Sequence, residues 1–213
     1  AYIEKNLKRL KRNTIAGYVL TCVGDEGKFS LIPSKFENCL SNRSARKIFK
    51  NNKIKFKEYS FLDRGSDERQ FNSPKVDLPI ASITRSKYGT YKEYHTSADN
   101  FNIVTNKGLS KSLKTIKKII NNIQSSKIPS PNITCEPFLS KRKMYPDFST
   151  TKGVGYGSNV SKGIRNIFSQ SILDFYMYCD GYTDIERISE KININYKKAL
   201  KYYNILKKEK IIK

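Results

Sequence analysis

His95 is the only histidine among the 213 residues of the chain, so a site with two imidazole groups cannot be built from this sequence alone. It lies in residues 94–99, after a predicted strand and a loop that contains glycine, and α/β enzymes place their sites at such positions. Asp99, four residues on, could orient the imidazole or cap the next helix. No G-x-S-x-G elbow is present to supply a serine nucleophile. A lone histidine is usually structural, so the hypothesis of a site at His95 depends on its surroundings.

A second candidate region packs charged side chains around a glycine and a serine. Residues 63–69 carry five charges, on Asp63, Arg64, Asp67, Glu68 and Arg69. A solvated loop could have this composition. The segment also follows the end of a predicted strand and precedes Phe71 and Pro74, which makes a clustered polar site the second interpretation.

The elements that must position these residues alternate between strands and helices. Residues 14–23 form an almost continuous apolar run, which predicts a buried strand of a mostly parallel sheet. Residues 44–50 predict a short helix, and residues 53–60 and 78–84 predict two further strands. This order indicates an α/β fold.

A longer helix is predicted where apolar residues recur at spacings of four and three. The spacing places them on one face, which we expect to cover the sheet. They are Leu109, Leu113, Ile116, Ile120 and Ile123. The opposite face carries lysines, which are interpreted as a solvated surface.

The C-terminal segment predicts three short helices and the start of a strand. Residues 164–175 form the first helix, and a capping box at residues 183–186 begins the second. Residues 196–206 form the third, and residues 211–212 could begin a strand. This pattern is typical of a winged helix whose wing is short or missing.

The composition indicates a folded protein with a strong positive charge. The net charge is +22, which could attract nucleic acid, but lysine, asparagine and isoleucine are abundant everywhere, as an AT-rich genome would produce. The four cysteines form no C-x-x-C pair, so reduced thiols in a cytoplasmic protein are expected. No apolar run reaches the length that spans a bilayer, so no membrane is expected as a partner.

Several of these segments occur in the order found in a known superfamily. Residues 66–71, 78–80 and 94–99 resemble the S-D-H-x-x-F, Gly-x-Pro and H-T-x-x-D segments of zinc aminopeptidases and glutaminyl cyclases. The chain is most similar to bacterial proteins with an aminopeptidase-like domain that are often described as polysaccharide-biosynthesis proteins and that also end in a winged helix-turn-helix. The segments that resemble this subgroup are residues 19–25, 63–71, 93–99 and 135–137, with Lys141, Arg142, Tyr145 and Pro146.

The resemblance implies a zinc-dependent hydrolase of amide or peptide bonds. His95 corresponds to a zinc ligand of the superfamily, and Asp67 to a carboxylate beside the metal. Glu68 stands where the superfamily has a histidine. Thr21 aligns with a metal-site aspartate, for which Asp25 could substitute. The first histidine, the bridging aspartate and the catalytic glutamate of the superfamily lie upstream of this segment, so the chain is expected to lack those ligands and to be inactive alone.

Within such a site, Asp67 and Arg69 are the expected catalytic residues. Asp67 would orient a ligand or the amine of the substrate. Arg64 and Glu68 are expected to bind substrate, and Arg64 or Arg69 could pair with a carboxylate through a two-pronged contact. Zinc is the expected cofactor, and a small peptide or aminoacyl compound is the expected substrate.

The predicted organisation is a partial aminopeptidase-like α/β domain, with a mixed sheet flanked by helices, over residues 1–150. A linker at residues 151–163 and a small α-helical winged-helix domain at residues 164–213 follow. Two rival functions remain. One is an inactive aminopeptidase-like scaffold in polysaccharide biosynthesis. The other is a winged-helix protein that binds DNA or protein, with homo-oligomers as one outcome and nucleic acid not favoured.

Overall fold

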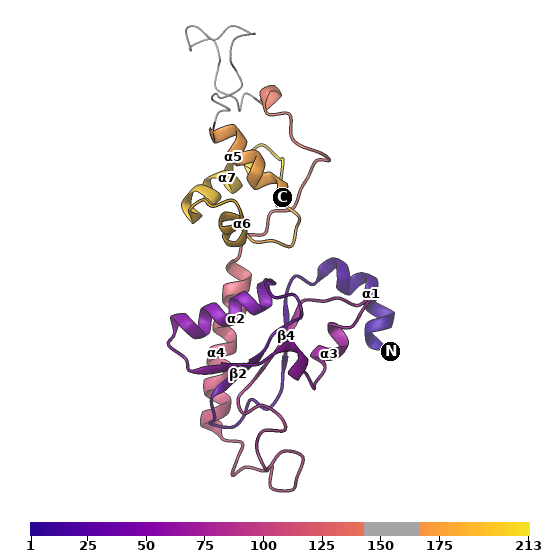
Figure 1. Cartoon of the computed structure of the whole chain (residues 1–213), viewed down its shortest axis with the longest axis vertical. Coiled ribbons are helices and arrows are strands. Elements are labelled where there is room, and N and C mark those ends of the chain that lie inside the picture. Colours follow the sequence, from indigo (N-terminus) through magenta and orange to yellow (C-terminus); the bar gives the residue numbers. More distant parts are fainter. Residues whose placement is uncertain (143–166) are drawn as a thin grey trace. The chain divides into compact units, whose positions relative to one another are not determined.

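The computed structural model describes residues 1–142 and 167–213 (Figure 1). They form two compact units, Ala1–Ser125 and Ser126–Lys213. The predicted linker at residues 151–163 and the Tyr145 and Pro146 positions lie outside the described residues. Residues 126–142, predicted to belong to the first domain, group with the C-terminal helices.

The first unit is built on a four-stranded mixed sheet with the strand order β1-β4-β2-β3. The strands are β1 (Gly17–Leu20), β2 (Phe29–Ile32), β3 (Phe56–Glu58) and β4 (Ile80–Thr84). β1 runs parallel to β4 and β2 parallel to β3, whereas β2 and β4 are antiparallel. The structure confirms the predicted mixed sheet of an α/β fold, in which two of the three strand pairings are parallel and β2 reverses direction beside β4.

Two strands differ from the sequence-based expectation. β2 was not predicted, yet all four of its residues are buried in the middle of the sheet. β1 was predicted to be buried, but it is an edge strand whose Leu20 is 46% exposed. Burial requires neighbours on both sides, and within the described residues β1 pairs only with β4.

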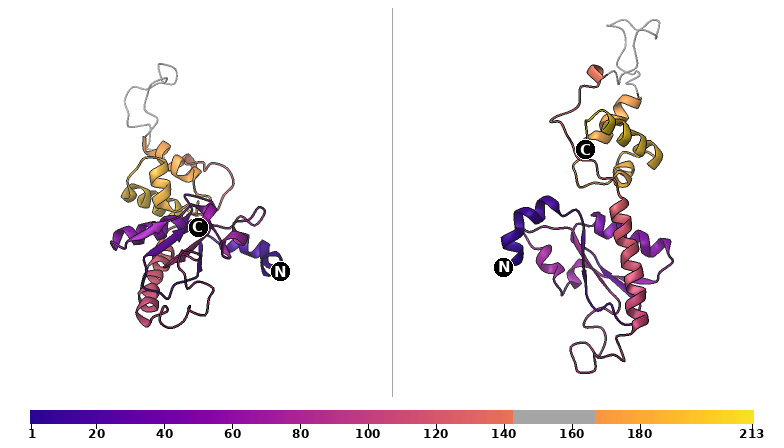
Figure 2. Two further views of the ribbon diagram at one scale, coloured as in Figure 1. Left: turned by 60° about the horizontal axis from the view of Figure 1, so that its bottom comes forward. Right: turned by 180° about the vertical axis from the view of Figure 1, so that it is seen from behind.

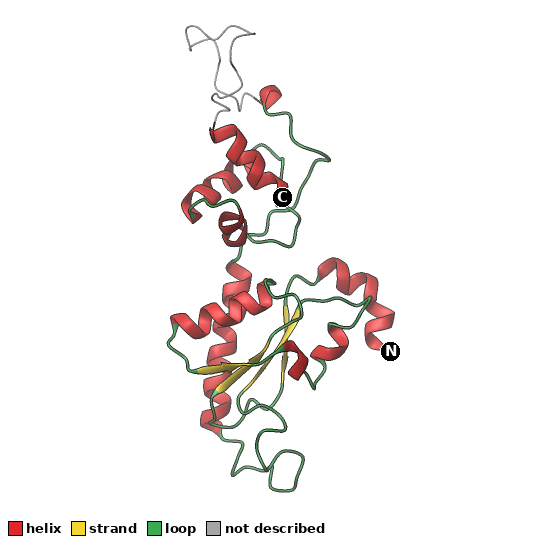
Figure 3. Ribbon diagram, in the orientation of Figure 1, coloured by secondary structure: helices red, strands yellow, loops and turns green. Residues whose placement is uncertain are grey.

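Helices cover both sides of the sheet (Figures 2 and 3). α2 (Leu40–Asn51) and α4 (Asn106–Ser125) pack together on one side. There Ala45, Phe49 and Ile119 join Phe29, Leu31, Ala81 and Ile83 in one apolar core. α1 (Tyr2–Asn13) and α3 (Glu68–Phe71) lie on the other side, where α3 contacts β4. A short 3-10 turn, η1 (Phe61–Asp63), precedes α3.

The predicted inner face of α4 is correct only in part, because Ile116 is buried and Ile123 packs against the core. Leu109, Leu113 and Ile120 are 42–54% exposed, and the buried residues are Gly108, Ser112, Thr115, Ile116 and Ile119. The cause is a close approach of the helix to the chain after β1. A Cβ atom at Gly108 would lie 2.0 Å from the carbonyl oxygen of Gly24, and the Ser112 hydroxyl donates a 2.7 Å hydrogen bond to the carbonyl of Val23. Small and polar residues therefore face inward.

The second unit contains η2 (Ser140–Arg142), α5 (Ile167–Met177), α6 (Ile185–Lys191) and α7 (Tyr196–Lys208). Ile172, Phe175, Ile188, Tyr202 and Leu206 are among the residues of its core. α6 begins one residue later than predicted, because Asp184, not Thr183, accepts hydrogen bonds from the backbone NH groups of Glu186 and Arg187. The predicted strand at residues 211–212 is a single bridge between Ile212 and Pro131.

Candidate functional site

The segment that follows β4 carries three tyrosines, Tyr88, Tyr91 and Tyr94, which we call the tyrosine cluster. Tyr94 packs against Tyr88 at a ring-centroid distance of 6.4 Å and against Tyr91 at 5.7 Å. On its other side Tyr94 stacks on His95, with centroids 3.9 Å apart. The cluster thus links His95 to the carboxyl end of β4, the side of the sheet where the sequence predicted a site.

Tyr88 connects the cluster to the charged segment of residues 63–69. Its hydroxyl donates a 3.0 Å hydrogen bond to Glu68 Oε1. The same oxygen accepts hydrogen bonds from the backbone NH groups of Gly65 and Ser66, at 2.8 and 3.1 Å. A Cβ atom at Gly65 would lie 2.5 Å from the Tyr88 ring, so this position requires glycine. The structure therefore brings Glu68 and His95 to two sides of one aromatic cluster.

Glu68 is completely buried, unlike the other charged residues of its segment. Its second oxygen, Oε2, is also buried and has no hydrogen-bond partner within residues 1–142 and 167–213. A buried carboxylate is costly unless donors compensate its charge, and here three donors converge on Oε1. Glu68 fixes the backbone of residues 65–66, a role that the predicted substrate contact did not foresee.

The carboxylate of Glu68 also acts on Tyr88. Burial raises the pKa of the Tyr88 hydroxyl above its ordinary value, and the nearby negative charge of Glu68 raises the pKa further. Because its pKa is raised, the Tyr88 hydroxyl keeps its proton, and its hydrogen bond to Glu68, at pH values above its ordinary pKa of 10.0.

α3 is held in place by the buried side chain of Asn72, which directly follows the helix. Its amide nitrogen donates to the carbonyl oxygens of Glu68 and Ile80, at 2.8 and 2.7 Å. Its amide oxygen accepts a 2.6 Å hydrogen bond from the Ser34 hydroxyl. These bonds fix the segment that carries Asp67 and Arg69 to β4 and to the residues after β2.

Asp25 lies between the ends of β1 and β4. Its carboxylate accepts hydrogen bonds from the hydroxyl and backbone NH of Ser86 and from the backbone NH of Gly27. Both oxygens are thus used to hold the turn after β1 against the end of β4. Asp25, Tyr91 and Glu93 also line a cavity of about 310 Å³. Burial and a hydrogen bond with the Cys22 thiol raise the pKa of Tyr91 at this cavity.

The other predicted site residues are exposed. Arg64 places its guanidinium 4.8 Å from the centre of the Phe61 ring. Asp67 stands at the start of α3 but its side chain caps no backbone NH group there. Arg69 lies on the same helix, on the solvent side. Their charged groups are available to a ligand, whereas Glu68 between them faces inward.

The residues that the structure describes do not form a complete metal centre. Nowhere in residues 1–142 and 167–213 do three or more His, Cys, Asp or Glu side chains come together in a group that could hold a metal ion. His95 is exposed, in a turn with a φ of 59°. Its imidazole could give one ligand, and Asp25 has its oxygens engaged by Ser86 and Gly27. The chemistry of this donor set does not fit a zinc site by itself.

Tyr88 and Tyr91 are the site residues that the sequence analysis missed. Their signal was the spacing of three residues between Tyr88, Tyr91 and Tyr94, which repeats through a segment rich in turns. Tyrosines are often core residues, and no regular helix or strand marked this segment. No helix of the described part combines the length and apolar character needed to cross a bilayer.

The fold and this site define a mixed α/β domain with a tyrosine-lined polar site beyond the end of its central strand. Residues 1–126 match a domain family of unknown function, DUF4910, and the chain belongs to that family. The family match covers the first compact unit and ends where the second begins.

A protein sequence and a crystal structure, both from Clostridium acetobutylicum, are similar to the chain. One, named as a candidate polysaccharide biosynthesis protein with an aminopeptidase-like domain, is 37% identical over 145 residues. This alignment covers 68% of the chain and 33% of that relative. The other is the crystal structure of a candidate peptidase, which superposes with a TM-score of 0.58 at 27% sequence identity. This superposition covers 100% of the chain and 44% of the crystallised chain. The chain therefore spans less than half the length of the relative and of the crystallised chain.

Proposed function

We propose that the chain is part of a peptidase-like hydrolase and contributes one side of its active site. The names of the relative and of the crystal structure, an aminopeptidase-like domain and a candidate peptidase, support a peptidase-like hydrolase. The observation that carries the proposal is the tyrosine cluster beyond the carboxyl end of β4. Glu68 contacts one side of this cluster through Tyr88, and His95 contacts the other side through Tyr94. Clustering of segments distant in sequence at this end of a sheet is typical of α/β enzyme sites.

In this proposal the buried and exposed residues of the charged segment have different roles. Glu68 holds the backbone of residues 65–66, and Asp67 next to it presents a carboxylate to solvent. A carboxylate there would bind the protonated amine of a peptide or aminoacyl substrate. Arg69 and Arg64 would bind a carboxylate of the substrate, since guanidinium pairs with it through two parallel hydrogen bonds.

Zinc is the cofactor that the superfamily resemblance suggests, and His95 is the ligand that we propose for it. The other zinc ligands would come from residues outside the part of the chain that the structure describes, since the described residues hold no group of three metal-binding side chains. The C-terminal unit is proposed to be the winged helix of the related bacterial proteins, and polysaccharide biosynthesis is proposed as the setting of the reaction.

The test is hydrolysis of a panel of aminoacyl amides and dipeptides by the full-length gene product. Asp67→Asn should lower kcat/KM by about 10- to 100-fold, because hydrogen bonds to charged groups contribute about 1.5–3 kcal/mol. Glu4→Gln, which removes an exposed carboxylate of α1, is the matched control and should leave kcat/KM unchanged. No hydrolysis of any substrate by the wild type would support an inactive scaffold instead.

A further inference from the structure

α7 differs from the other helices of the second unit in its charge. Its 13 residues include five lysines and no carboxylate. Lys197, Lys201, Asn204 and Lys208 follow one another at spacings of four, three and four, and all four are exposed. These spacings place them on one face of a helix. We call this set the α7 stripe.

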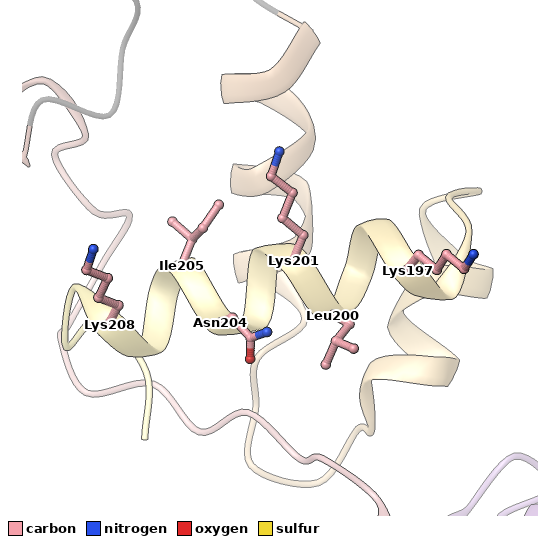
Figure 4. A pocket seen from close by; sticks show the side chains of 6 residues that line it. All are labelled: Lys197, Leu200, Lys201, Asn204, Ile205 and Lys208. Carbon is pink, nitrogen blue, oxygen red and sulfur yellow. The ribbon is translucent and has the colours of Figure 1, made fainter.

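The stripe borders a shallow cavity of about 390 Å³ on the surface of α7 (Figure 4). The half-buried apolar residues Leu200 and Ile205 line it together with the four stripe residues. The opposite side of α7 carries Ala199, Tyr202 and Leu206, which are fully buried in the core of the unit. The stripe is thus the face of α7 directed away from its core.

The connection between α6 and α7 and the start of α7 resemble those of DNA-binding helix pairs. α6 and α7 pack on each other and are joined by four residues, 192–195. The side chain of Asn195 caps α7 by accepting a hydrogen bond from the backbone NH of Lys198. In helix-turn-helix proteins the second of two helices so joined lies in the major groove of DNA. At a rise of 1.5 Å per residue α7 is about 20 Å long, and the B-DNA major groove is about 12 Å wide.

We propose that the α7 stripe binds the major groove of duplex DNA. The three lysines would pair with phosphates and with acceptor atoms of guanine, and the Asn204 amide matches the donor and acceptor pair of adenine. Leu200 and Ile205 offer apolar contacts to thymine methyl groups. The major groove of duplex RNA is too deep and narrow for a helix, so the proposal is restricted to DNA.

The high overall charge requires an experiment that separates the stripe from general attraction. The probe is a fluorescein-labelled DNA duplex of mixed sequence, roughly 20 base pairs long, or two helical turns. Binding of the whole chain is measured by fluorescence anisotropy over a series of KCl concentrations. The stripe variant carries Lys197→Gln, Lys201→Gln and Lys208→Gln. The matched control carries Lys111→Gln, Lys114→Gln and Lys117→Gln, which remove three exposed lysines from α4 of the other unit.

The stripe variant should bind the duplex about 100-fold more weakly near 0.1 M salt, because each phosphate contact contributes about 0.9 to the log–log salt slope. Its slope should be shallower by about 2 to 3, whereas the control should keep the wild-type slope. Asn204→Ala, which removes no charge, should also keep that slope.

Equal weakening by the two triple variants would overturn the proposal in favour of general charge attraction. Absence of wild-type binding at low salt, or equally tight binding to a duplex RNA or to phosphatidylserine vesicles, would also overturn it. Circular dichroism spectra of the variants establish that they are folded. Lys197→Gln alone gives a second, milder test and should lower the slope by about 0.9.

Discussion

The Glu68 segment and the His95 turn meet at the same tyrosine cluster but are built in opposite ways. Glu68 is 0% exposed and receives three hydrogen bonds at one oxygen, from residues on two sides of the site. His95 is exposed, has a positive φ and is supported through the face of Tyr94. Residues of the chain itself thus bind one oxygen of Glu68, while the imidazole of His95 remains accessible to a ligand.

This difference suggests that the Glu68 segment stabilises the fold of the site and that the His95 turn binds a ligand. A buried carboxylate with several donors fixes the backbone around it, and its loss would be costly to the fold. An exposed imidazole that stacks on one tyrosine ring contributes less to the fold than a buried and hydrogen-bonded carboxylate. Variants in the first region should therefore change stability, and variants in the second should change ligand binding.

The largest expected effect is that of Glu68→Ala. It removes the acceptor of two backbone NH groups and of the Tyr88 hydroxyl, which should lower the free energy of unfolding by about 3 kcal/mol or more. Urea denaturation followed by circular dichroism measures the change. Arg69→Ala, one residue away on the solvent side, is the control and should have little effect. An unchanged midpoint for Glu68→Ala would show that the buried carboxylate does not stabilise the segment.

α4 offers the same contrast between adjacent residues. Ile119 is 0% exposed in the core under the sheet, whereas Ile120 is 42% exposed. Ile119→Ala should cost about 3 kcal/mol of unfolding free energy, within the range for buried isoleucines, and Ile120→Ala should cost much less. Equal losses in thermal or urea unfolding would contradict the contrast between a buried Ile119 and an exposed Ile120.

Sequence patterns located most of the elements of the first unit. The apolar runs predicted β1, β3 and β4, and the spacing of Ala45 and Phe49 predicted α2. β2 was missed because four residues without a periodic signal become a central strand only through pairing with distant segments. The inner face of α4 was predicted only in part, because Gly108 and Ser112, which carry no apolar signal, make the close approach.

The candidate site was predictable in its segments but not in its geometry. His95 was singled out as the only histidine and Asp67 as part of a charged segment, and the resemblance then implied roles for both. That Glu68 would be buried in a run of charges was not foreseeable, since charged residues are rarely buried unless partners compensate them. Those partners include Tyr88, which is twenty residues away in the sequence.

A smaller effect is expected for Tyr88→Phe. It removes one of the three hydrogen bonds to Glu68 Oε1 and leaves the two backbone donors in place. The free energy of unfolding should fall by about 1 kcal/mol, less than for Glu68→Ala. A loss as large as that of Glu68→Ala would instead assign the stability of the segment to Tyr88.

The smallest effect is a dependence of stability on alkaline pH. The pKa of Tyr88 is raised above its ordinary value of 10.0 by burial and then by the charge of Glu68. Above pH 10.0 the unfolded chain loses this proton while the folded chain keeps it, so stability present below that pH falls as pH rises. The slope of stability against pH above 10.0 should be shallower in Tyr88→Phe. Identical slopes in both proteins would contradict the raised pKa.

The most direct test of the central claim is the zinc content of the full-length gene product and its His95→Ala variant, measured by mass spectrometry beside thermal unfolding of the metal-free proteins. Ser97→Ala, at an exposed position two residues further along the same segment, is the control. The account predicts stoichiometric zinc in the wild type and the control, its loss in His95→Ala, and the same unfolding temperature in all three metal-free proteins. No zinc in the wild type, or equal zinc in His95→Ala, would contradict the assignment of His95 as a ligand.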